Sequence, residues 1–166
     1  MADVPVDLYR AVRSSDWGKK ADKRTETFTK AEGGGSLFPL YIGRTLPDGG
    51  VRPPDVTWFS DSNGVNWIRG VEDREHAPDW REGVSTSTTC GRMGFLGRFY
   101  FFLPKGTPVD SSLDVKHTPE EDDDGHYSIR CRTLMRQDAY EGALNNLARA
   151  ALAKAVELGK QSIYHS

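Results

Sequence analysis

The chain has 166 residues, of which 37% are hydrophobic and 28% charged, and its formal net charge is −2. This composition is typical of a globular protein and excludes a disordered chain or a membrane-embedded one. The small net charge gives no long-range attraction to nucleic acids or anionic lipids, so no clear nucleic-acid binding is expected. The length fits a single domain over residues 1–166 that buries its own core.

Targeting signals are absent from the sequence as printed. The N-terminal stretch MADVPVDLYR has neither the basic nor the apolar part of a secretory signal. No run approaches the roughly 18 apolar residues of a membrane span. The two cysteines, Cys90 and Cys131, favour reduced thiols over a disulfide framework. We therefore expect a cytoplasmic protein that needs dedicated machinery if it is exported.

The N-terminal half is predicted to be rich in loops. A short strand lies within Val4–Val12, and Ser15 or Asp16 is placed to cap a short helix after it. Ala31–Ser36 (AEGGGS) has the composition of a flexible joint. Thr45–Asp55 (TLPDGGVRPPD) combines proline, aspartate and glycine in the manner of a turn.

A strand followed by a helix is predicted in the middle of the chain. Val56–Phe59 (VTWF) has strand composition. Ser60 or Asp61 is placed to cap a helix after it, although Gly64 weakens that helix. The apolar residues of the predicted helix are Val65, Trp67 and Ile68.

The C-terminal half predicts three strands and a long helix. The strands are Val84–Thr88, Phe95–Pro104 and His126–Met135, and an acidic loop, Pro119–Gly125, precedes the last of them. Apolar residues at steps of three and four then predict an amphipathic helix between Asp138 as cap and Gly159. Its stripe consists of Tyr140, Leu144, Leu147, Ala151, Ala155 and Leu158. Together these elements predict an α+β fold with a mixed or antiparallel sheet and flanking helices.

An arginine in the first strand is the first candidate site residue. If Leu8 packs inward, alternation along the strand directs Arg10 inward as well. A buried guanidinium needs a carboxylate or a phosphate, and its planar fork suits phosphate. A structural pair with an aspartate, or an exposed edge strand, explains the same pattern.

A run of hydroxyl residues and one histidine are the next candidates. Ser85, Ser87 and Thr89 share one face of the predicted strand, where they would form a polar floor for a ligand. An exposed edge strand is the alternative. His126 begins a strand, and a histidine there is placed to orient a ribose hydroxyl or to act as an acid or base. It is equally explained as a surface residue beside carboxylates.

Other classes of site find no support in the sequence. The histidines have no zinc-ligand spacing, and the acidic loop lacks the pattern of a calcium-binding hand. Nucleotide-binding glycine motifs and the nucleophile elbow are also missing. The aromatic residues Trp58, Phe59 and Trp67 suit stacking on a flat ring, with core packing as the alternative.

Three segments resemble elements of ADP-ribosyltransferases. The arginine strand of that fold resembles LYRAV (Leu8–Val12), and its Ser-Thr-Ser strand resembles GVSTS (Gly83–Ser87). Its aromatic strand and the helix that follows resemble TWFSDSNGVNWI (Thr57–Ile68). The longest shared pattern, Leu103–Leu152, is similar to the toxin family founded by the second exported effector of a type VI secretion system. The resemblance covers roughly half of the chain, and Val12–Gly83 aligns poorly.

The resemblance implies an ADP-ribosyltransferase-like fold and a toxin that uses NAD. The family's functional Thr-Ser pair falls on Thr86 and Ser87, or on Ser85 and Thr86 after a one-residue shift, and its histidine falls on His126. NAD contacts are implied for five residues, which are Arg10, Tyr9, Ser85, Trp58 and Phe59. A Glu-x-Glu or Gln-x-Glu motif on a late strand is missing, although such a glutamate normally holds the ribose 2′-hydroxyl.

The resemblance also implies partners and a place of action. A cognate immunity protein, the secretion machinery and an unknown macromolecular target are expected, with action in the cytoplasm of a target cell. Three alternatives remain: an RNA 2′-phosphotransferase that uses NAD, a non-enzymatic toxin that blocks a host protein, and an inert scaffold. Arg130, Arg132 and Arg136 would supply the basic groove of the first alternative.

Overall fold

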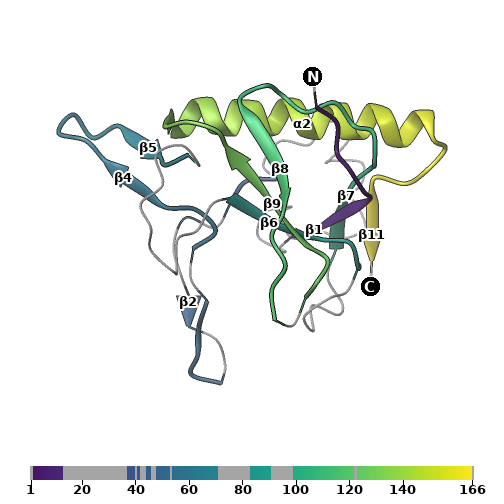
Figure 1. Cartoon of the computed structure of the whole chain (residues 1–166), viewed down its shortest axis with the longest axis horizontal. Helices are drawn as coiled ribbons and strands as arrows, with labels where there is room; N and C mark the ends of the chain where they lie inside the picture. The colour runs from purple at the N-terminus through teal and green to yellow at the C-terminus, as the bar shows by residue number, and fades with distance from the viewer. Residues whose placement is uncertain are drawn as a thin grey trace.

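An antiparallel β-sheet and one long helix dominate the part of the chain that the structure describes (Figure 1). The structure is a computed structural model, and it describes residues 2–12, 37–39, 41, 44–45, 48–52, 54–70, 83–90, 99–121 and 123–165. The predicted α+β class is confirmed, with antiparallel pairing throughout the strands described.

The largest sheet holds the strands on which most candidate site residues lie. Its order is β11 (Ile163–His165), β7 (Phe99–Leu103), β1 (Leu8–Val12), β6 (Gly83–Ser87), β9 (His126–Cys131) and β8 (Leu113–His117). Strands β1 and β6, 71 residues apart at their nearest ends, are therefore neighbours at the centre of the sheet. The predicted strand His126–Met135 is shorter than expected and ends at Cys131.

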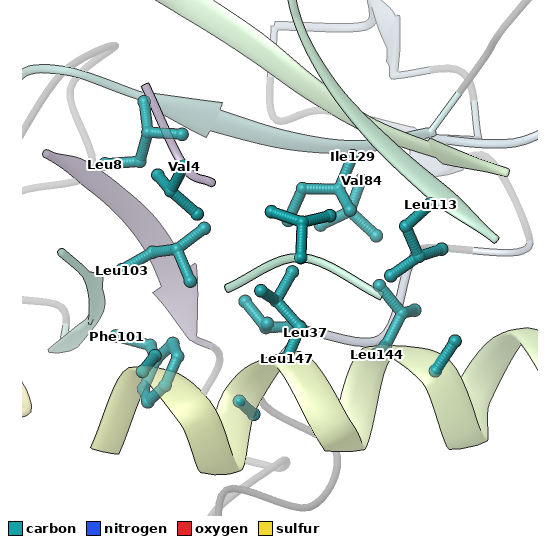
Figure 2. Close-up of a cluster of buried hydrophobic side chains, with 14 of the residues drawn as sticks. Val4, Leu8, Leu37, Val84, Phe101, Leu103, Leu113, Ile129, Leu144 and Leu147 are labelled. Carbon is teal, nitrogen blue, oxygen red and sulfur yellow. The ribbon is translucent and has the colours of Figure 1, made fainter. Parts of the chain in front are cut away.

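The hydrophobic core lies between this sheet and helix α2 (Gln137–Glu157), as Figure 2 shows. Leu144 and Leu147 of the helix belong to one buried cluster with side chains from several sheet strands, among them Leu8 and Ile129. Burying each large apolar side chain contributes about 1.5–3 kcal/mol. The helical residues that are buried are Tyr140, Ala143, Leu144, Leu147, Ala148, Ala151 and Ala155.

The ends of α2 differ in part from the prediction. Arg136 occupies the N-cap position without a side-chain cap bond, and Asp138 lies in the first turn, so the predicted Asp138 cap is wrong. The carboxylate there still complements the positive end of the helix. Gly159 adopts a positive φ of 66°, which confirms it as the residue that ends the helix. Leu158 is exposed and lies outside the buried stripe.

A hairpin replaces the helix predicted after Phe59. Strands β4 (Trp58–Ser60) and β5 (Asn66–Ile68) pair antiparallel, and β10 (Met135–Arg136) extends the sheet beside β5. The Asp61 carboxylate accepts the N–H groups of Asn63 and Val65, at 2.9 and 3.0 Å, and so closes the turn. Gly64 has a φ of 78°, which no right-handed helix allows. The predicted helix over this segment is therefore wrong.

The turn predicted within Thr45–Asp55 lies in a second hairpin. Strands β2 (Arg44–Thr45) and β3 (Val51–Arg52) pair there, and Gly49 has a φ of 86°. The predicted helix after Ser15 or Asp16, the joint over Ala31–Ser36 and the first part of Phe95–Pro104 lie outside the described residues.

Candidate active site

Three of the candidate residues share the face of the large sheet that is turned away from α2. Tyr9 of β1 is opposite Ser87 of β6, and Ser87 is opposite His126 of β9. Residues directly opposite one another in a sheet project to the same face, and neighbours along a strand project to opposite faces. Leu8 and Ile129 project to the core, so the row Tyr9–Ser87–His126 crosses three strands on the other face.

Arg10 forms a buried ion pair with an aspartate that the sequence analysis did not single out. Its Nη2 donates to Asp55 Oδ2 at 3.0 Å and to the Phe38 carbonyl at 3.1 Å, and Nη1 donates to the Ser85 carbonyl at 2.9 Å. The two charged side chains are only 9% and 3% exposed. This arrangement corresponds to the alternative of a structural pair with an aspartate.

The Arg10–Asp55 pair lies where β1 and β6 cease to pair. Among the described residues, the register between these strands is recorded at Tyr9 opposite Ser87, although both strands continue beyond it. The Asp55 Oδ1 atom also lies 3.3 Å from Ser85 Oγ, which donates to it. Asp55 therefore links the arginine strand to the hydroxyl strand and fixes the side chain of Ser85.

Thr86 lies on the opposite face from Ser87. It is buried, 3% exposed, and its Oγ1 donates to the Tyr127 carbonyl at 3.0 Å across the β6–β9 pair. Ser87 Oγ instead accepts the backbone N–H of Thr89 at 3.2 Å. Of the predicted Thr86–Ser87 pair, only Ser87 is thus placed beside His126 and Tyr9.

The His126 imidazole is buried and held from one side. Its Nδ1 lies 2.9 Å from the Thr118 carbonyl and 2.9 Å from Thr118 Oγ1, which in turn lies 2.7 Å from Ser128 Oγ. Because a carbonyl only accepts, Nδ1 carries a proton. The other ring nitrogen, Nε2, is buried without a hydrogen-bond partner and lies 3.6 Å from Glu120 Oε1.

Tyr9 belongs to an aromatic cluster on the same face as Ser87. Its ring stacks on Phe102 at 5.3 Å and meets the edge of Tyr164 at 5.7 Å. Burial raises the pKa of Tyr9, and Tyr164 and Asp7 add to the shift. Tyr9 therefore presents a neutral hydroxyl and an aromatic surface at neutral pH.

Trp58 and Phe59 lie in the separate β4–β5–β10 sheet. Trp58 Nε1 donates to the Tyr41 carbonyl at 2.7 Å, and the two rings meet edge to face at 6.5 Å. The Arg69 guanidinium lies over the Phe59 ring, 4.6 Å from its centre. In the described part of the chain, no hydrogen bond or ring contact is recorded between these two aromatics and Ser87 or His126.

The arginines proposed for an RNA groove all have acidic neighbours. Arg130 hydrogen-bonds and pairs with Asp114, and Arg132 lies 3.9 Å from the same carboxylate. Arg136 pairs with Asp138 at 3.4 Å. Partial neutralisation of all three weakens the case for a basic groove.

Sequence reasoning missed Asp55, Thr118 and Glu120, which support Arg10 and His126. The acidic loop, interpreted as solvated, places Glu120 against the imidazole, while Asp123 at the base of the loop is buried. Among the described residues, no group of three or more histidine, cysteine or acidic side chains is arranged to hold a metal ion. The helix that the structure describes is too polar to cross a membrane.

Comparison with known families gives one extensive match. A family model described as Tse2 ADP-ribosyltransferase toxin matches residues 6–156. The matched range includes every candidate site residue and all strands except β11, and it ends one residue before the last residue of α2. No curated protein sequence gave a significant match.

Proposed function

Because the chain belongs to the Tse2 ADP-ribosyltransferase toxin family, we propose that it is a toxin that breaks the nicotinamide–ribose bond of NAD. The ADP-ribose is transferred to a macromolecule, or to water in a glycohydrolase reaction. The family match over residues 6–156 is the observation that carries this proposal. The row of Tyr9, Ser87 and His126 on one face of the sheet supports it.

The proposed reaction needs alignment of NAD more than proton transfer to the leaving group. Nicotinamide is a cationic ring in NAD and departs neutral, with the electron pair of the broken bond. The ribose carbon then carries positive charge in an oxocarbenium-like state, which oriented dipoles and hydroxyl contacts stabilise. In the proposal, Ser85 or Ser87 hydrogen-bonds the ribose or the carboxamide, and His126 aligns a ribose hydroxyl. Trp58 or Phe59 packs beside the nicotinamide.

Arg10 is proposed to contact the ribose or the pyrophosphate while anchored by Asp55. A guanidinium has five N–H donors, and three hydrogen bonds to protein acceptors are recorded for Arg10. Its remaining donors suit a phosphate oxygen. The same anchoring contacts hold Ser85, so the loss of Arg10 is expected to disturb the hydroxyl strand as well.

The proposed toxin acts inside a target cell after export by its secretion machinery. A protein that consumes NAD harms the cell that makes it, so a cognate immunity protein is proposed to block the site until export. The macromolecule that receives ADP-ribose is the third proposed partner.

Expression in a bacterial host tests the proposed function. Expression of the chain without an immunity protein is expected to stop growth, lower cellular NAD and release nicotinamide. With adenine-labelled NAD, a transferase places label on macromolecules, whereas a glycohydrolase does not. The Ser87→Ala variant should weaken all of these effects, while Ser111→Ala, at an exposed position before β8, should leave them unchanged. Growth arrest with constant NAD and no labelled product would contradict the proposal and indicate a toxin that blocks a host protein.

A further inference from the structure

The edge strand β8 (Leu113–His117) has one side that no other strand covers among the described residues. It is the last strand of the large sheet and pairs there with β9 alone. All five of its residues pair one to one with β9, without a bulge. Natural edge strands are commonly interrupted or covered, because a regular edge is a template for a further strand.

The hydrogen bonds at the two ends of β8 decide which of its backbone groups point outward. The Ser112 carbonyl accepts the N–H of the residue after β9 at 3.0 Å, and the Thr118 N–H donates to the carbonyl of the first residue of β9 at 2.9 Å. Backbone groups alternate in direction along an antiparallel strand. The groups that point to the outer edge therefore belong to Leu113, Val115 and His117.

These outward groups match those of a second β8 that runs antiparallel to the first about a two-fold axis at Val115. Each Val115 donates its N–H to the carbonyl of the other and accepts a bond in return. The His117 N–H donates to the Leu113 carbonyl of the second copy. The Leu113 N–H is not needed for the match, because it already donates to the Asp110 carbonyl at 2.9 Å.

The two charged residues of β8 favour this register. With Val115 at the centre, Asp114 of each copy is directly opposite Lys116 of the other, in a non-hydrogen-bonded pair where side chains approach most closely. Lys116 is exposed, and no ion pair is recorded for it in the part of the chain that the structure describes. Asp114 is 25% exposed beside Arg130, so its carboxylate remains accessible. A centre two residues to either side along β8 loses the pairing of these charges.

We propose that the outer edge of β8 binds a second copy of this chain, so that two large sheets join into one antiparallel sheet across a two-fold axis. The axis is perpendicular to the sheet, so the row Tyr9–Ser87–His126 of both copies lies on the face opposite both α2 helices. The inference concerns assembly and does not rest on the proposed reaction. One pair of short strands makes a small interface, for which a dissociation constant on the order of 10–100 μM is expected.

Sedimentation equilibrium of the purified full-length chain tests this assembly. The mean mass should rise from 18.5 kDa toward twice that value as the protein concentration increases through the expected range. Lys116→Glu places like charges opposite one another and should raise the dissociation constant about tenfold or more. Lys105→Glu makes the same change of charge at an exposed position outside β8 and should keep the dissociation constant of the unaltered chain. A mass of one chain at all concentrations up to about 1 mM would overturn the inference.

Hydrogen exchange in the unaltered protein locates the interface without any variant. The N–H groups of Val115 and His117 should exchange about tenfold more slowly in the dimer than in the monomer, while those of Asp114 and Lys116, which face β9, should change little. Equal exchange of Val115 and His117 at low and high concentration would overturn the inference, even if a dimer forms through another surface. Protection of these two groups only after an immunity protein is added would also overturn it, because the edge then binds that partner.

Discussion

At the scale of single residues, the buried ion pair of Arg10 and Asp55 is expected to contribute to the stability of the fold. Removing one member leaves an uncompensated buried charge, and such losses cost about 3–5 kcal/mol. Arg10→Ala is therefore expected to lower the free energy of unfolding by about that amount, measured by urea denaturation of the purified protein. An unchanged unfolding free energy would contradict the structural role of the pair.

A paired substitution supplies the control for Arg10. Replacing both members by apolar residues of similar size, Arg10→Met with Asp55→Leu, is expected to restore most of the stability lost in Arg10→Ala. If the paired variant is as stable as the unaltered chain and still fails to cleave NAD, the ion pair contributes to the site, either through the arginine itself or through the position of Ser85. Full activity in that variant would leave Arg10 with a structural role alone.

Tyr140 gives the protein a predictable response to alkaline pH. Its hydroxyl donates to the Ile129 carbonyl at 2.8 Å in the core, and burial raises its pKa well above the ordinary value of 10.0. Below pH 10 the phenol is neutral in both folded and unfolded chains, so its contribution to stability is complete. Above pH 10 the unfolded phenol ionises first, and stability falls. Tyr140→Phe should lose about 1 kcal/mol at pH 7 and show a shallower decline above pH 10 in denaturant titrations; an equally steep decline would contradict this.

From the sequence, the burial of a single residue was predictable where strand alternation applies, but its distant partners were not. Alternation placed Arg10 inward with Leu8, and the structure confirms that it is buried. Its partner Asp55 lies 45 positions away in a turn-rich segment, and no local pattern connects the two. Glu120 was equally hidden, because a run of acidic residues gives no sign that one of them faces a buried imidazole.

At the scale of elements, a glycine controls how closely β6 and β9 pack. A Cβ added at Gly83 would lie 2.0 Å from the Ile129 carbonyl oxygen, which belongs to the backbone and cannot rotate away. Gly83→Ala is therefore expected to force the strands apart and to cost about 2–3 kcal/mol. The measurement is the thermal midpoint, and a midpoint within about 1 °C of the unaltered protein would contradict the close approach.

A glycine in α2 is the matched control for Gly83. A Cβ added at Gly142 meets nothing within 4 Å, and the position lies within the helix. Alanine has the higher helix propensity, so Gly142→Ala is expected to raise stability by about 0.5–1 kcal/mol. The change from glycine to alanine should thus lower the stability of the protein at Gly83 and raise it at Gly142.

Among the elements, regular patterns were predictable and local side-chain chemistry was not. The stripe of α2 and the strands at Leu8–Val12 and Gly83–Ser87 follow directly from apolar spacing. The β4–β5 hairpin was mistaken for a helix because Asp61 is a good cap in either setting. The strand β8 went unpredicted, although Leu113 and Val115 alternate with polar residues as a half-buried strand requires.

At the scale of the whole molecule, the architecture brings Tyr9, Ser87 and His126 from three strands onto the face of the sheet opposite α2. The resemblance seen in the sequence is confirmed by the family match. Arg10 and Thr86, which the resemblance also assigns to the site, lie outside this row. Thr86 projects to the other face, and Arg10 is bound to Asp55 where β1 and β6 cease to pair.

The purified full-length chain, incubated with NAD labelled in the nicotinamide ring, tests the central claim most directly. We expect free nicotinamide to appear in a reaction that depends on the amount of protein and is strongly reduced in Ser87→Ala and His126→Gln variants that retain the unaltered melting temperature. Adding the host-cell extract as a source of acceptors should leave nicotinamide release intact or increase it. If no nicotinamide is released, with or without extract, from a folded protein that still stops bacterial growth, the chain is not an enzyme that cleaves NAD.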